Sequence, residues 1–167
     1  MPMKSATKPA EPTPRSKLAR PRLALSVQRA VRAPDAPTRN EILRFARAAL
    51  QRNAEITLRL VSEAEGRSLN HAYRGKDYAT NVLTFVYAST PTVSGDMVLC
   101  APVISREAAT QGKSVLAHYA HLIVHGVLHL HGYDHDNDHD AQRMETRETD
   151  IVTGLGFADP YAEMEHD

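Results

Sequence analysis

The stretch HGVLHLHGYDH, residues 125–135, contains three histidines whose spacing suits a metal site. His125 and His129 are four residues apart, so a helix would place them on one face and roughly 6 Å apart along its axis. Gly132 favours a helix end there, because glycine readily adopts a left-handed backbone conformation. The chain can then turn back and present His135 as a third ligand. Three neutral imidazoles leave one coordination position open, as in catalytic zinc sites.

Four other histidines lie in or near this stretch. His118 is about 10 Å along the helix from His125, too far to share an ion with it comfortably. His121 and His125 could form a rival pair, but no glycine and third histidine follow that pair. We therefore expect packing or ligand-supporting roles for His118 and His121. We expect His131 to point to another face and His139 to face solvent.

Position 126 separates this pattern from that of zinc peptidases. Metzincin proteases place three ligands at the same spacing in H-E-x-x-H-x-x-G-x-x-H, and their glutamate is the general base. Gly126 occupies the place of that glutamate and has no side chain to accept a proton. The pattern therefore predicts metal-assisted hydrolysis without an assigned general base. Asp134 is a candidate base or histidine-orienting group, and equally a capping or solvated loop residue.

Strands and helices are mixed along the chain, without repeats or a nucleotide-binding glycine pattern. This mixture predicts an α+β fold, with a roughly four-stranded mixed sheet covered by helices. The helix at 115–132 would carry the histidine motif. The hydrophobic patterns predict strands at 23–30, 54–63, 81–87 and 95–100, and helices at 38–53, 62–75, 102–112, 115–132 and 138–154.

Length and composition limit the class of protein. The chain has 167 residues and a single cysteine, Cys100, which excludes an internal disulfide and fits a reducing compartment. No run approaches the roughly 18 apolar residues that span a bilayer. Residues 1–22 hold six basic residues and five prolines, which predicts a flexible basic tail rather than a signal peptide. Residues 23–167 are expected to form one domain.

Charge is unevenly distributed. Residues 1–60 hold 13 Lys and Arg against 4 Asp and Glu, whereas residues 61–167 hold 7 against 16. A basic half can bind a polyanion such as RNA, but ordinary solvated helix faces explain the same pattern. Charge alone therefore leaves the partner open.

Three blocks of sequence resemble the YbeY family of bacterial metal-dependent endoribonucleases. HYAHLIVHGVLHLHGYDH (118–135) contains the family signature H-G-x-L-H-L-x-G-Y-D-H. SLNHAYRGKDYATNVLTF (68–85) is similar to the family block that begins L-N-x-x-Y-R-x-K-D, and SGDMVLC (94–100) to its G-D-[IV]-x-[IL]-C strand. Met97 replaces the usual branched residue, and Tyr78-Ala79 replaces a residue followed by proline.

The resemblance implies a cytoplasmic, single-strand-specific endoribonuclease for ribosomal RNA processing, notably 16S rRNA 3′-end maturation, and for ribosome quality control. It implies one Zn²⁺ held by His125, His129 and His135, which would activate water and polarise the phosphate. Other transition metals also accept three imidazoles. Arg74 is the implied catalytic and RNA-binding residue, and Lys76 could help to hold the backbone. The implied partners are ribosomal RNA and the ribosome or its assembly factors, with no membrane and an open oligomeric state.

Two alternative interpretations share these motifs. One is a ribosome-associated assembly factor whose metal is mainly structural, and the other is a peptidase or another small-substrate hydrolase, which Gly126 disfavours. Chelation separates catalytic from structural metal, because removing a structural ion would melt the domain. The sequence leaves water and the ribose 2′-hydroxyl as alternative nucleophiles.

Overall fold

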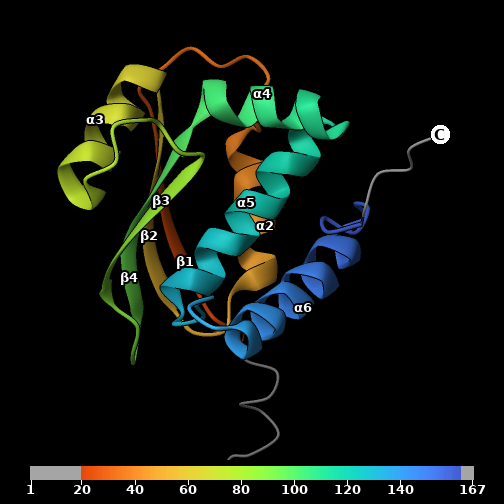
Figure 1. Cartoon of the computed structure of the whole chain (residues 1–167). Coiled ribbons are helices and arrows are strands. Elements are labelled where there is room, and N and C mark those ends of the chain that lie inside the picture. The colour runs from red at the N-terminus through yellow and green to blue at the C-terminus, as the bar shows by residue number, and fades with distance from the viewer. Residues whose placement is uncertain (1–19, 163–167) are drawn as a thin grey trace, which may run out of the picture.

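The computed structural model describes residues 20–162, so most of the tail predicted for residues 1–22 lies outside the described range. Within that range the structure has four strands and five helices (Figure 1). In chain order these are β1 (Leu23–Arg29), α2 (Arg39–Ala49), β2 (Ala54–Val61), α3 (Glu63–Arg74), β3 (Val82–Ala88), β4 (Val93–Cys100), α4 (Ala101–Gln111), α5 (Val115–Leu130) and α6 (Asp138–Gly154).

The strands form one mixed sheet in the order β1-β2-β4-β3. β1, β2 and β4 are parallel, and β3 runs antiparallel to β4 at the edge. The predicted α+β class with a four-stranded mixed sheet is therefore confirmed. Thr84 pairs with Met97 and the next residue, Phe85, pairs with Asp96. Because successive side chains of a strand point to opposite faces, these two pairs lie on opposite sides of the sheet.

Helices cover both faces of the sheet unequally. The main core lies between the sheet and the helices α2 and α5, while α6 packs on the outer side of α5 (Figure 1). Its fully buried side chains include Phe45, Leu58, Met97, Ile123 and Leu128. A smaller cluster around Leu83, Val98 and Cys100 packs below α3 on the other face. The edge strand β3 thus has the main core on one side and a thinner layer on the other.

The helix that carries the histidine motif begins and ends at side-chain and backbone caps. The Ser114 hydroxyl accepts a hydrogen bond from the N–H of Ala117 at the start of α5. At the end, Gly132 has a φ of +105°, and the N–H of Tyr133 donates to the carbonyl of Leu128. This Schellman-type closure satisfies the last carbonyls and turns the chain sharply. The helix stop expected at Gly132 is confirmed.

One predicted helix is too long. The helix expected at 38–53 begins after Thr38, whose side chain caps it, but ends at Ala49. The N–H groups of Gln51 and Arg52 instead donate to Nε2 of His131, at 3.1 Å and 3.3 Å. Tertiary hydrogen bonds therefore replace the last helical turn. In residues 20–162 no helix combines the length and apolar character needed to cross a membrane.

Candidate metal centre

The three predicted histidines line one cavity of about 290 Å³, together with Arg74 and a stretch of β3 (Val82, Leu83 and Thr84). The ring centroids of His125 and His129 are 6.4 Å apart, those of His125 and His135 are 5.8 Å apart, and those of His129 and His135 are 6.1 Å apart. The helical pair and the histidine beyond Gly132 thus form a nearly regular triangle, as their spacing predicts.

The triangle is slightly wider than a closed ligand set. Three imidazoles around one tetrahedral zinc place their centroids roughly 5 Å apart, given zinc–nitrogen bonds of about 2 Å. Among residues 20–162 no three or more His, Cys, Asp or Glu side chains lie close enough together to hold a metal ion as they stand. The three rings would form a closed ligand set if each pair of ring centroids moved about 1 Å closer together.

A buried carboxylate holds the first histidine. Oε2 of Glu148, on α6, lies 2.7 Å from Nδ1 of His125, and its Oε1 lies 2.8 Å from Nε2 of His121. The Tyr161 hydroxyl also donates to Oε1. Glu148 is fully buried, with an exposed fraction of 0%. A buried carboxylate is tolerated only when hydrogen-bonded and paired, and the two imidazoles and the phenol meet that requirement.

The charge of Glu148 follows from this network. Burial alone would raise its pKa, but the hydrogen bonds from His121, His125 and Tyr161 outweigh burial and lower the pKa to about 2. Burial and the neighbouring carboxylate raise the pKa of the Tyr161 hydroxyl. Glu148 is therefore an anion and Tyr161 a neutral donor at neutral pH.

A threonine side chain of the sheet contacts His129, the second histidine of the cluster. Oγ1 of Thr84, on β3, lies 3.0 Å from Nδ1 of His129. Burial, with smaller contributions from His125 and His135, lowers the pKa of His129. The ring is thus neutral at neutral pH, which is the form that binds a metal.

These contacts determine which ring nitrogens of His125 and His129 remain free to bind a metal. With Nδ1 of His125 on Glu148 and Nδ1 of His129 on Thr84, each ring keeps Nε2 for another partner. Metal-binding histidines commonly engage their second ring nitrogen with a carboxylate or another polar group in this way. Three nitrogen donors of this kind suit zinc and other late transition metals. The donor set at this cavity therefore fits the metal that the sequence implies.

Arg74 is the last residue of α3 and lines the same cavity as the imidazoles. The next residue, Gly75, ends α3 in a left-handed conformation with a φ of +70°. Arg74 and Lys76 are both exposed, and neither forms an ion pair within residues 20–162. By contrast, Arg67 on the same helix is paired with Asp77 at 2.8 Å. The cavity thus has an available guanidinium at its rim, and Lys76 lies outside the cavity lining.

The four other histidines in or near the motif lie outside the cavity lining. His118 is buried against Glu107, with 2.9 Å between Nε2 and the carboxylate. His121 is hydrogen-bonded to the Glu148 carboxylate. His131 is buried and accepts hydrogen bonds from backbone N–H groups. His139 is exposed on α6. Packing and ligand-supporting roles, expected for His118 and His121, fit their positions, and His139 faces solvent as expected.

Gly126 faces the sheet rather than the cavity. A Cβ atom built on it would lie 2.7 Å from Sδ of Met97, on β4. Met97 has only 1% of its surface exposed, so the side chain fills the space beside the glycine. A glutamate at this position would collide with the core. Asp134, the candidate base, accepts the N–H of Asp136 at 3.3 Å within the loop.

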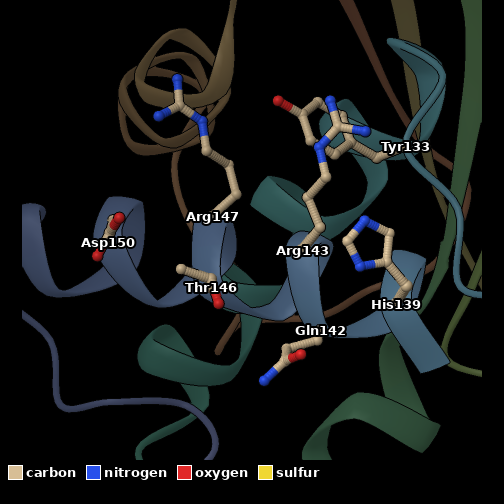
Figure 2. Close-up of a pocket in the computed structure, with 7 residues that line it drawn as sticks. All are labelled: Tyr133, His139, Gln142, Arg143, Thr146, Arg147 and Asp150. Atoms are coloured by element: carbon tan, nitrogen blue, oxygen red, sulfur yellow. The ribbon is translucent and has the colours of Figure 1, made fainter.

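A second cavity of about 440 Å³ lies beside α6 and the loop that precedes it (Figure 2). Arg143 and Arg147 project from α6 on one side, and the Arg143 guanidinium lies 5.1 Å from the centre of the Tyr133 ring. His139 is the histidine of this cavity. Its lining includes none of the three clustered imidazoles, so it is separate from the candidate metal centre.

Glu148, Thr84 and Tyr161 were not predicted from the sequence. Glu148 lies four residues from both Met144 and Val152, and these three are the buried residues of α6. A glutamate in the apolar stripe of an amphipathic helix is a signal of a buried charge with a partner. Thr84 and Tyr161 give no such signal, because their roles depend on how β3 and the C-terminal segment meet α5.

Comparison with known proteins agrees with this fold and site. A solution structure from Thermotoga maritima superimposes with a TM-score of 0.50 at 22% identity, over 84% of this chain and 99% of the other. It supports the α+β fold. The family model described as Endoribonuclease YbeY matches residues 31–156. The chain therefore belongs to the endoribonuclease YbeY family, a family of hydrolytic nucleases.

Curated relatives cover most of the chain. A protein named Endoribonuclease YbeY from Aromatoleum aromaticum is 59% identical over 144 residues, which are 84% of this chain and 94% of that protein. One of the same name from Methylibium petroleiphilum is 56% identical over 145 residues, covering 86% of this chain and 97% of that protein. The family predicted from the three sequence blocks is thus confirmed.

Proposed function

We propose that this chain is a zinc-dependent, single-strand-specific endoribonuclease of ribosomal RNA processing, acting in 16S rRNA 3′-end maturation and ribosome quality control. It would work in the cytoplasm, with the ribosome or its assembly factors as partners. One observation carries the proposal: three imidazoles and an exposed arginine line the same cavity, in a chain of the endoribonuclease YbeY family.

His125 and His129 would hold the metal through Nε2, and His135 would supply a third ring nitrogen. When bound, the metal supplies Lewis acidity that activates water and polarises a phosphoryl oxygen. Glu148 and Thr84 keep two of the rings in position, which limits the reorganisation needed during reaction.

Arg74 would hold the scissile phosphate beside the imidazoles. Its guanidinium stays charged and offers a planar fork of donors, which suits two phosphate oxygens. Lys76, two residues further on, could bind a neighbouring phosphate of the strand as a point charge. Placing the phosphate is a large part of catalysis in phosphoryl transfer, because the correct alignment replaces a costly encounter.

A comparison of four proteins on a labelled ribosomal RNA fragment tests this proposal. We expect wild type to cut, His129→Ala to lose both metal and cutting, and Arg74→Glu to keep the metal but lose cutting. Arg147→Glu is the matched control, because Arg147 is an exposed helical arginine outside the imidazole cavity. Removing a charged contact to phosphate should cost at least about tenfold in rate. Equal cutting by all four proteins would mean that the nuclease activity is a contaminant.

Chelation separates the proposed enzyme from an assembly factor with a structural metal. If the metal is catalytic, a chelator abolishes cutting while the thermal unfolding transition persists. If the domain melts on chelation, the structural role gains support. The buried position of Gly126 against Met97 gives the peptidase alternative no support.

A further inference from the structure

Exposed aromatic rings gather at the edge strand β3, which also contributes to the lining of the imidazole cavity. Tyr73 is 67% exposed and Tyr87 is 66% exposed, whereas Phe85 is partly buried. The rings of Tyr73 and Phe85 meet edge to face with their centroids 5.0 Å apart. The Tyr87 hydroxyl donates to Asp96, which pairs with Phe85 across the strands. We call Tyr73, Phe85 and Tyr87 the aromatic platform.

Folding does not explain this platform. A tyrosine contributes to stability mainly through the area that it removes from water, and two-thirds of Tyr73 and Tyr87 stays exposed. The neighbouring residues from His71 to Tyr78 are exposed as well. Large exposed aromatic side chains that gather on one part of a soluble protein mark an interaction site more often than a packing accident.

The platform and the cavity lie on opposite sides of the same edge strand. Phe85 packs against the cluster beneath α3, and Tyr87 donates to Asp96, which pairs with Phe85. Thr84 instead faces α5 and touches His129. In Figure 1, α3 and α5 accordingly lie on opposite sides of β3. The end of α3 bridges the two faces: Tyr73 contacts Phe85, and the next residue, Arg74, lines the cavity.

The charges along this route suit a polyanion. Arg74 and Lys76 are exposed and form no ion pair in the part of the chain that the structure describes. Single-stranded nucleic acids bind proteins through cationic side chains that follow the backbone and aromatic rings on which bases stack. A duplex cannot use such rings, because its bases are already stacked on each other.

We propose that the aromatic platform is a base-stacking site for single-stranded RNA, from which the backbone crosses the β3 edge past Arg74 to the imidazoles. This inference rests on the proposed function and names the structural feature that selects unpaired RNA. A strand would place unpaired bases against Tyr73 and Tyr87 while its adjacent phosphate reaches Arg74. The platform binds and positions RNA, and it takes no part in bond breaking.

Tryptophan fluorescence tests the platform directly, because the chain has no tryptophan. We would compare Tyr87→Trp with Ala48→Trp, in which the new indole lies on the exposed face of α2. The full-length, zinc-loaded proteins are titrated with an unstructured ten-nucleotide RNA and with the same sequence as a duplex, and gels check that the RNA stays intact. We expect the single strand to quench the indole at position 87 and not that at position 48. The duplex should quench neither.

Affinity gives the second readout. The double variant Tyr73→Ala/Tyr87→Ala should bind the single strand at least roughly tenfold more weakly, since each stacked base contributes appreciably to affinity. Tyr73→Phe/Tyr87→Phe keeps the rings and should restore most of the affinity. Metal content and the unfolding transition should match wild type in both, because the replaced rings are largely exposed.

The possible results separate this inference from the proposed function. Equal affinity of wild type and the double alanine variant, or quenching at position 48 alone, overturns the platform, even if RNA is cut normally. If RNA quenches the indole at position 87 but wild type never cuts, the platform holds and the nuclease proposal fails. A platform that ignores RNA and instead binds a ribosomal protein overturns the inference as well.

Discussion

Glu148 lies with its carboxylate 2.7 Å from Nδ1 of His125, although the two residues are 23 positions apart and belong to different helices. The carboxylate is completely buried and is shared with His121 and Tyr161. Since Glu148 is an anion, it fixes the Nδ1–H tautomer of His125 and leaves Nε2 as the donor to a metal. The helix α6 therefore does more than cover α5, because it determines which nitrogen of His125 faces the cavity.

Replacing Glu148 should weaken metal binding without removing a ligand. We expect Glu148→Gln to lower zinc affinity by about 10- to 100-fold, because an amide orients the imidazole less firmly and does not raise its basicity. Competition with a chromophoric chelator measures this affinity. Glu145→Gln, on the exposed side of the same helix, is the control and should bind zinc like wild type. Unchanged affinity in Glu148→Gln would show that Glu148 only fills the core.

Thr84, on the sheet strand β3, should also strengthen metal binding by orienting a histidine ligand. Thr84→Val keeps the shape of the side chain but removes the hydroxyl that contacts Nδ1 of His129 at 3.0 Å. We expect zinc affinity to fall by about tenfold, the lower end for such supporting contacts. Thr84→Ser retains the hydroxyl and should recover most of the affinity. If valine and serine behave alike, the hydroxyl does not orient His129.

These two contacts mark the limit of what the sequence predicts. The helix α5, its stop at Gly132 and the three clustered histidines all lie within one short stretch, so helical geometry and glycine conformation suffice to predict them. Glu148 and Thr84 come from α6 and β3, and their distances to the histidines depend on tertiary packing. The predicted end of the helix at 38–53 was wrong for the same reason, since His131 accepts hydrogen bonds from the backbone N–H groups of Gln51 and Arg52.

Gly126 should be needed for packing rather than for chemistry. Gly126→Ala places a Cβ atom 2.7 Å from Sδ of Met97, and this overpacking should lower the free energy of unfolding by about 1–3 kcal/mol. Gly154→Ala is the matched control, because nothing lies within 4 Å of a Cβ there and alanine favours a helix by up to about 1 kcal/mol. Urea unfolding measures both. A Gly126→Ala protein as stable as wild type would mean that Met97 repacks freely.

Acid should destabilise the fold in part through His118, which has no role in the metal centre. Burial lowers its pKa below the ordinary value of 6.5, although Glu107 opposes this effect, and Lys113 and His121 lower the pKa further. The unfolded chain therefore takes up the proton first as the pH falls. The stability contributed by neutral His118 is complete above pH 6.5 and is lost as the pH falls below it.

The comparison of wild type with His118→Gln isolates this residue, because every other ionisable group is present in both proteins. We expect the free energy of unfolding of wild type to fall more than that of the variant between pH 7.5 and pH 5.5, as measured by urea unfolding without added metal. His139→Gln is the control, since His139 is exposed and its loss should leave the pH dependence of wild type unchanged. An equal fall in wild type and His118→Gln would mean that the Glu107 carboxylate stabilises the protonated ring enough to cancel the cost of burial.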